Sequence, residues 1–122
     1  MRTFNPSASH PERAAQAWQI LVGMAMNRQT ITYGGLAKLM YRREAPGVLA
    51  SILGHIAYYC DENGLPQLNA LVVGGKRGAP GHDIPLSSTA IDATREKVYK
   101  RDWYNVCPPS LDDLAAAWDA RQ

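Results

Sequence analysis

A chain of 122 residues, of which 46% are apolar and 20% charged, has the length and composition of a single folded domain with a hydrophobic core. This composition excludes an intrinsically disordered protein, and no apolar run approaches the roughly 18 residues of a membrane-spanning helix. The formal net charge of +2 is too small to select a class of partner by itself. Cys60 and Cys107 lack CxxC spacing and the N-terminus lacks a signal-peptide core, so we expect a cytoplasmic protein without disulfides or a membrane partner.

Two helices are predicted in the first third of the chain. Ser9 precedes Pro11 in a typical helix opening, and apolar residues then recur at helical spacing up to about Asn27. Thr32 is suited to cap a second, shorter helix that ends near Arg42, because its hydroxyl can accept a bond from a backbone N–H of the first turn. The apolar stripe of the longer helix, which we expect in the core, comprises Ala14, Ala17, Trp18, Leu21, Val22 and Ala25.

A third helix is predicted from about Pro46 to Asp61. The Asn63-Gly64 pair after it is typical of a helix that ends with a residue in the left-handed conformation. The buried stripe of this helix is expected to be Val48, Leu49, Ile52, Leu53, Ile56 and Tyr59, whereas another face carries Ser51, His55 and Tyr58.

A short β element and a loop are predicted next. Residues 68–75, LNALVVGG, are β-like in composition and too few for another helix. Residues 74–83 contain four glycines and are rich in turn formers, which indicates a hairpin tip or a wing.

Two further helices are predicted in the last third of the chain. Ser88 or Thr89 is suited to open a helix that runs to about Lys100, with Ile91 and Val98 facing inward. A final helix is predicted after a capping box in which Ser110 is followed by Asp113 rather than glutamate, and its apolar side comprises Leu111, Leu114, Ala115 and Trp118. The sequence therefore predicts a mainly α domain with a small β element.

No complete set of catalytic or metal-binding residues is apparent in the sequence. Cys60 follows His55 by five positions rather than four, so we expect it to be a buried apolar side chain rather than half of a Cys–His pair. Cys107, in WYNVCPP, is expected in a packed extended segment, and His82 beside Asp83 either orients a phosphate or is solvated. Because the metal-binding spacings and the Walker pattern are missing, we expect no metal and no cofactor and do not favour an enzyme.

Basic residues gather in three groups along the chain. The first lies between residues 28 and 43, where no acidic residue occurs, and the C-terminus is acidic. Such asymmetry is typical of a polyanion-binding surface but also of ordinary solvated faces. The basic groups are Arg28, Lys38, Arg42 and Arg43, then Lys76 and Arg77, then Arg95, Lys97, Lys100 and Arg101, and the acidic residues are Asp112, Asp113 and Asp119.

Three segments occur in an order that resembles a known family. They are ITYGGLAKLM at 31–40, PGVLASILGHI at 46–56 and GLPQLNALVVGGKRGAPG at 64–81. They resemble the C-terminal domain of the alkylguanine-DNA alkyltransferases and their alkyltransferase-like relatives. In that family a V-S/T-Y-G-x-L-A segment opens a helix-turn-helix, and a recognition helix, a PCHRVV strand and a glycine-rich loop follow. The resemblance covers roughly residues 10–82 and implies a winged helix-turn-helix core. We expect one domain over 1–122, in which 86–122 form a helical C-terminal extension.

The resemblance implies roles for individual positions. Tyr33 matches the tyrosine that presses on the phosphate of the target nucleotide, although such a ring can equally pack over the third helix, and Thr32 matches a residue that meets the DNA backbone. Asn69 stands where the acceptor cysteine would be, so alkyl transfer is not expected, because an amide cannot serve as the nucleophile. The arginine that enters the duplex falls near Ala50, so the resemblance does not extend to base flipping. The remaining matches are Ala70 for the histidine, Leu71 for the arginine of the strand motif and Val72-Val73 for the valine pair.

The first function that fits these features is a non-enzymatic module that binds double-stranded DNA or another nucleic acid. Residues near the helix-turn-helix and in the wing would contact phosphates, and two residues of the third helix would face the groove. The residues predicted to bind nucleic acid are Thr32, Tyr33, Lys38, Arg42, Arg43, Ser51, His55, Lys76 and Arg77.

The second function is a protein-interaction or inhibitor module that keeps the fold without DNA binding. Domains of this size serve in mobile-element, defence and counter-defence systems, and the partner would then be an unidentified protein. The positions of five basic residues discriminate between the two, because their convergence on one face favours DNA and their scatter over the surface favours a protein. These residues are Lys38, Arg42, Arg43, Lys76 and Arg77.

Overall fold

The computed structural model describes residues 1, 3–4, 8–42, 47, 49–74 and 88–122. Over these residues the protein is mainly helical with one small two-stranded parallel sheet. The longer helices are α1 (His10–Met26), α2 (Tyr33–Tyr41), α3 (Leu49–Glu62), α4 (Ser88–Lys100) and α5 (Leu111–Asp119). Two 3-10 turns, η1 (Leu68–Leu71) and η2 (Trp103–Asn105), and two strands, β1 (Ile31–Thr32) and β2 (Val72–Val73), complete the described elements.

Capping interactions set several of the helix ends, as the sequence predicts. The Thr32 hydroxyl accepts a hydrogen bond from the Gly35 N–H at 2.9 Å and begins α2. At α5 the side chain of Ser110 and that of Asp113 each bond the other residue's backbone N–H, at 3.0 and 2.9 Å, which is a complete capping box. Gly64, with φ of 66°, ends the segment after α3 in the left-handed conformation.

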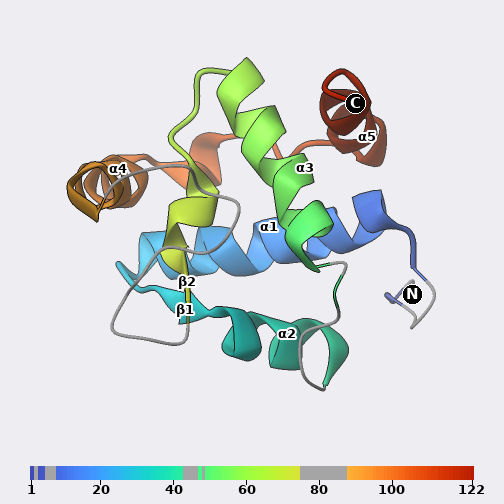
Figure 1. Cartoon of the computed structure of the whole chain (residues 1–122), viewed down its shortest axis with the longest axis horizontal. Helices are drawn as coiled ribbons and strands as arrows, with labels where there is room; N and C mark the ends of the chain where they lie inside the picture. The colour runs from blue at the N-terminus through green and yellow to red at the C-terminus, as the bar shows by residue number, and fades with distance from the viewer. Residues whose placement is uncertain (2, 5–7, 43–46, 48, 75–87) are drawn as a thin grey trace.

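Helix α1 lies in the middle of the molecule, as Figure 1 shows. Helix α2 packs on one side of α1, while α3 and α5 pack on the other side and against each other (Figure 1). Trp18 of α1 is 4% exposed and meets the rings of Tyr59 and Trp103 edge to face, each at 5.7 Å, so the prediction that Trp18 lies in the core is confirmed. The large apolar residues that are at most 1% exposed include Leu21, Leu36, Leu49, Ile52, Leu53, Ile56, Leu68, Leu71, Ile91 and Leu114.

The β element is shorter than the sequence predicts. Residues 68–71 form η1 rather than a strand, because the Ala70 N–H turns back to the Gln67 carbonyl at 3.0 Å. Only Val72 and Val73 are extended, and they pair in parallel with Ile31 and Thr32 of β1. Two parallel strands must be separated by a long crossover in the chain. The local composition of residues 68–75 therefore could not show which of them would pair with a partner strand.

Other boundaries differ by small amounts. Helix α3 begins at Leu49, and Pro46, where its start was predicted, lies outside the described residues. The predicted loop at 74–83 is described only at Gly74. Leu111, predicted on the apolar side of α5, is 36% exposed because it stands at the first position of the helix, beyond the packed part of its stripe.

Candidate nucleic-acid interface

The strand pairing brings two distant segments together. Thr32, the residue that caps α2, pairs with Val73, and Ile31 pairs with Val72. Helix α2 therefore starts from the same small sheet into which η1 leads, and it also contacts β2 directly. The predicted nucleic-acid residue Thr32 thus pairs with the strand that directly follows η1, the segment that contains Asn69.

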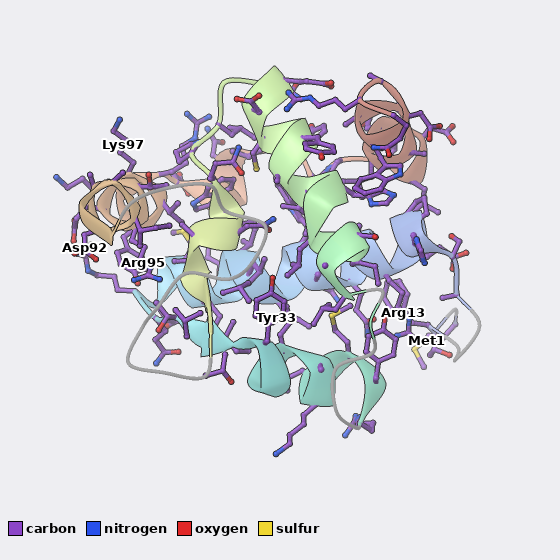
Figure 2. All side chains as sticks on the ribbon, in the orientation of Figure 1. Met1, Arg13, Tyr33, Asp92, Arg95 and Lys97 are labelled. Atoms are coloured by element: carbon purple, nitrogen blue, oxygen red, sulfur yellow. The ribbon has the colours of Figure 1, made fainter. Side chains whose placement is uncertain are left out.

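Side chains hold η1 in place on both sides. Asn69 is 1% exposed and its Nδ2 donates to the Leu53 carbonyl of α3 at 2.5 Å, while its Oδ1 is buried with no hydrogen-bond partner among the described residues. Gln67 Nε2 donates to the Ala57 carbonyl, also of α3, at 3.0 Å. From α4, Arg95 Nε donates to the Ala70 carbonyl at 2.7 Å, and Figure 2 shows this side chain directed toward η1. The sequence has no signal for these bonds, since each acceptor is a backbone carbonyl of another element.

The described titratable groups near this segment do not assemble a nucleophilic site. Cys60 is fully buried, and burial raises the pKa of its thiol to about 11, so the thiol is protonated near neutral pH. Cys107 is exposed on a different part of the chain. No group of three His, Cys, Asp or Glu side chains within the described ranges is placed to hold a metal ion.

The structure corrects the predicted orientation of His55. We expected His55 to face a DNA groove, but the side chain is 3% exposed and stacks on Trp118 of α5 at 4.6 Å with an interplanar angle of 2°. Its Nδ1 bonds the Ser51 carbonyl at 2.7 Å, and Ser51 itself is half-buried. Burial lowers the pKa of His55 below 6.5, and the nearby His10 acts in the same direction, whereas the Ser51 carbonyl and Asp119 oppose it. Helical spacing identified this face of α3 correctly but could not show that α5 covers it.

Tyr33 and Thr32 both make contacts that stabilise the fold. Tyr33 is half-buried and packs against the core, and Figure 2 shows its ring directed inward from the start of α2. The Thr32 hydroxyl serves as the cap of α2, although the residue is exposed. The backbone at this corner is therefore rigid and partly accessible.

The basic residues of the described chain do not share one face. Arg28 pairs with Glu96 at 2.6 Å and lies over the Tyr99 ring at 4.9 Å, and Arg95 is held against η1. Lys97 points away from α2 and the strands, as Figure 2 shows. Lys38 and Arg42 are exposed, and neither side chain forms a hydrogen bond or ion pair within the part of the chain that the structure describes. The predicted contacts Arg43, Lys76 and Arg77 lie outside the described residues, so only Lys38 and Arg42 are described among the five residues whose convergence discriminates DNA from a protein partner.

Comparison of the chain with protein-family models, with curated proteins and with solved structures finds no match. Of the helices that the structure describes, none combines the length and apolar character needed to cross a membrane.

Proposed function

We propose that this protein is a non-enzymatic DNA-binding module with the winged helix-turn-helix organisation of the alkyltransferase-like proteins. The observation that supports this best is the parallel pairing of β1 with β2. It places ITYGGLAKLM beside LNALVV, the two segments whose sequences carry the resemblance. Because these segments are well separated in the chain, their contact is a tertiary feature that sequence proximity does not explain.

The residues at the acceptor position support a role without group transfer. Asn69 has an amide where an alkyltransferase has its thiolate, and this amide is buried and bonded to α3. The nearest cysteine along the chain, Cys60, has a thiol whose raised pKa keeps it protonated. Neither side chain is suited to accept an alkyl group, so the proposed function is binding without group transfer.

The proposed contacts are with the phosphate backbone. Thr32, Tyr33 and Lys38 lie at the start and middle of α2, and Arg42 follows its last turn. Arg43, Lys76 and Arg77 are proposed to add further positive charge. Contacts of this kind release counterions, so affinity is weak, nearly independent of sequence and steeply lowered by salt.

A salt titration tests this function. The protein is titrated into fluorescently labelled duplex and single-stranded DNA of the same sequence, between about 50 and 200 mM salt, with anisotropy as the readout. We expect binding to the duplex that weakens linearly on a plot of log affinity against log salt. If the protein binds neither DNA at about 50 mM salt, where electrostatic contacts are strongest, the proposed function is wrong.

A second candidate, a protein-interaction or inhibitor module, is favoured by one observation. Leu39 is 51% exposed and Phe4 is 40% exposed, and both line a surface hollow of about 490 Å³ beside the end of α2. Exposed apolar residues at a hollow are typical of protein interfaces. This function takes precedence if the DNA titration is negative.

A further inference from the structure

The outer side of α2 carries a strip of three residues spaced four apart, Gly34, Lys38 and Arg42, which we call the α2 strip. We propose that the α2 strip, rather than α3, is the surface that lies against the DNA backbone. This inference rests on the proposed function, because it names the face that a DNA-binding module would use. It departs from the expectation that the third helix enters the groove through Ser51 and His55.

Helix α3 has little surface left for a nucleic acid. Its sides pack against α1, α5 and η1, as Figure 1 shows. The small side chains Ala50 and Ala57 are only partly exposed. The exposed residues at the end of the helix are Asp61 and Glu62, whose charge would repel phosphates. The described part of α3 thus presents no exposed basic side chain.

Helix α2, in contrast to α3, carries exposed basic side chains. Its inner residues Leu36, Ala37 and Met40 are buried against the core, and α3 and α5 lie on the far side of α1 (Figure 1). Its outer side carries Lys38 and Arg42, whose side chains make no polar contact within the described chain. These two cations are therefore available to phosphates.

Gly34 is a glycine that the packing does not require. A Cβ at Gly34 would meet no heavy atom within 4 Å, whereas a Cβ at Gly35 would lie 3.1 Å from Thr32 Oγ1 and 3.2 Å from Ile31 Cγ1. Gly35 is thus explained by its contacts with Thr32 and Ile31, whereas Gly34, in the first turn of α2, leaves open space on the outer side of the helix. A glycine at such a position permits the close approach of another backbone.

Arg42 has a backbone conformation that arginine rarely adopts. Its φ is 61° and its ψ is 21°, the left-handed conformation that glycine usually supplies after a helix. Arg28, the other described non-glycine residue with positive φ, also follows a helix, where its N–H bonds the Ala25 carbonyl at 3.1 Å, and its guanidinium contacts Glu96 and Tyr99. The Arg42 side chain has no comparable contact among the described residues.

Charge removal on two helices tests the inference. The variant Lys38→Gln with Arg42→Gly removes both cations of the α2 strip, and glycine suits the backbone at residue 42. The control Lys97→Gln with Lys100→Gln removes the same net charge from exposed positions of α4. At about 50 mM salt we expect the α2 variant to bind duplex DNA at least about tenfold more weakly, with a salt slope reduced by about two, and the α4 variant to change affinity less than about threefold. Thermal melts establish that each variant is folded.

A second pair of variants separates α2 from α3. Gly34→Glu places a carboxylate on the α2 strip, and Ala50→Glu places one on the partly exposed side of α3. We expect the first to abolish most binding and the second to have little effect. If wild-type protein binds DNA but the α4 pair or Ala50→Glu weakens binding as much as the matching α2 change, the assignment of the α2 strip is wrong and DNA binding stands. If wild-type protein does not bind DNA at all, both proposals are wrong, and an acidic protein surface becomes the partner to test.

Discussion

Gly54 of α3 lies directly against Trp118 of α5. A Cβ at this position would lie 2.5 Å from Cζ3 and 3.3 Å from Cε3 of Trp118. The indole ring is held on two further sides, since it stacks on His55 at 4.6 Å and on Tyr58 at 5.5 Å. Gly54→Ala therefore cannot be accommodated by a simple rotation of the ring, and we expect it to destabilise the protein.

The magnitude follows from two opposing effects. Non-bonded carbons ordinarily lie about 3.5–4.0 Å apart, so the added methyl group forces α5 away from α3 by about 1 Å. Overpacking of this kind costs about 1–3 kcal/mol. Replacement of glycine by alanine inside a helix offsets this by up to about 1 kcal/mol. With the full offset the net loss is about 0–2 kcal/mol, and its upper value is a substantial part of a total stability of about 5–15 kcal/mol.

Gly23→Ala is the matched control, because Gly23 lies inside α1 and a Cβ there would meet nothing within 4 Å. We expect this control to raise the free energy of unfolding by about 0.5–1 kcal/mol. Urea denaturation followed by tryptophan fluorescence and by circular dichroism measures both variants. If Gly54→Ala is as stable as Gly23→Ala, then α5 does not pack on α3 as described here.

Three further predictions concern the core, the absence of alkyl transfer, and the titration of His55. Trp18→Ala should lower the free energy of unfolding by about 3–5 kcal/mol, because a large buried ring is lost, and an unchanged denaturation midpoint would place Trp18 on the surface. Incubation with alkylated DNA should add no mass to the protein, since Asn69 is an amide and Cys60 stays protonated, and a stoichiometric adduct in the mass spectrum would contradict this. Because the pKa of His55 is lowered in the folded state, the folded protein binds fewer protons than the unfolded chain, so this contribution to stability is complete above pH 6.5 and is lost as the pH falls below that value. His55→Phe keeps a ring against Trp118 and should reduce this acid sensitivity, and an equal loss of stability in both proteins would assign the effect to other groups.

The sequence alone determined the features that depend on neighbours in the chain. The cap at Thr32, the capping box of Ser110 and Asp113 and the left-handed Gly64 each involve contacts or conformations within a few residues. The apolar stripe that buries Trp18 is equally local, because helical periodicity places residues three and four apart on one face. These signals were enough to predict five helices and a mainly α domain.

Only the tertiary structure decided which face of each helix meets another element. Periodicity assigned His55 to a separate face of α3, but the stacking with Trp118 requires α5 to fold back from the far end of the chain. The bonds from Asn69 to Leu53 and from Arg95 to Ala70 end on backbone carbonyls. Every residue type has a backbone carbonyl, so no pattern of residue types predicts these bonds. The outward position of Lys38 and Arg42 depends in the same way on long-range packing, since a helix face is exposed only if no other part of the chain covers it.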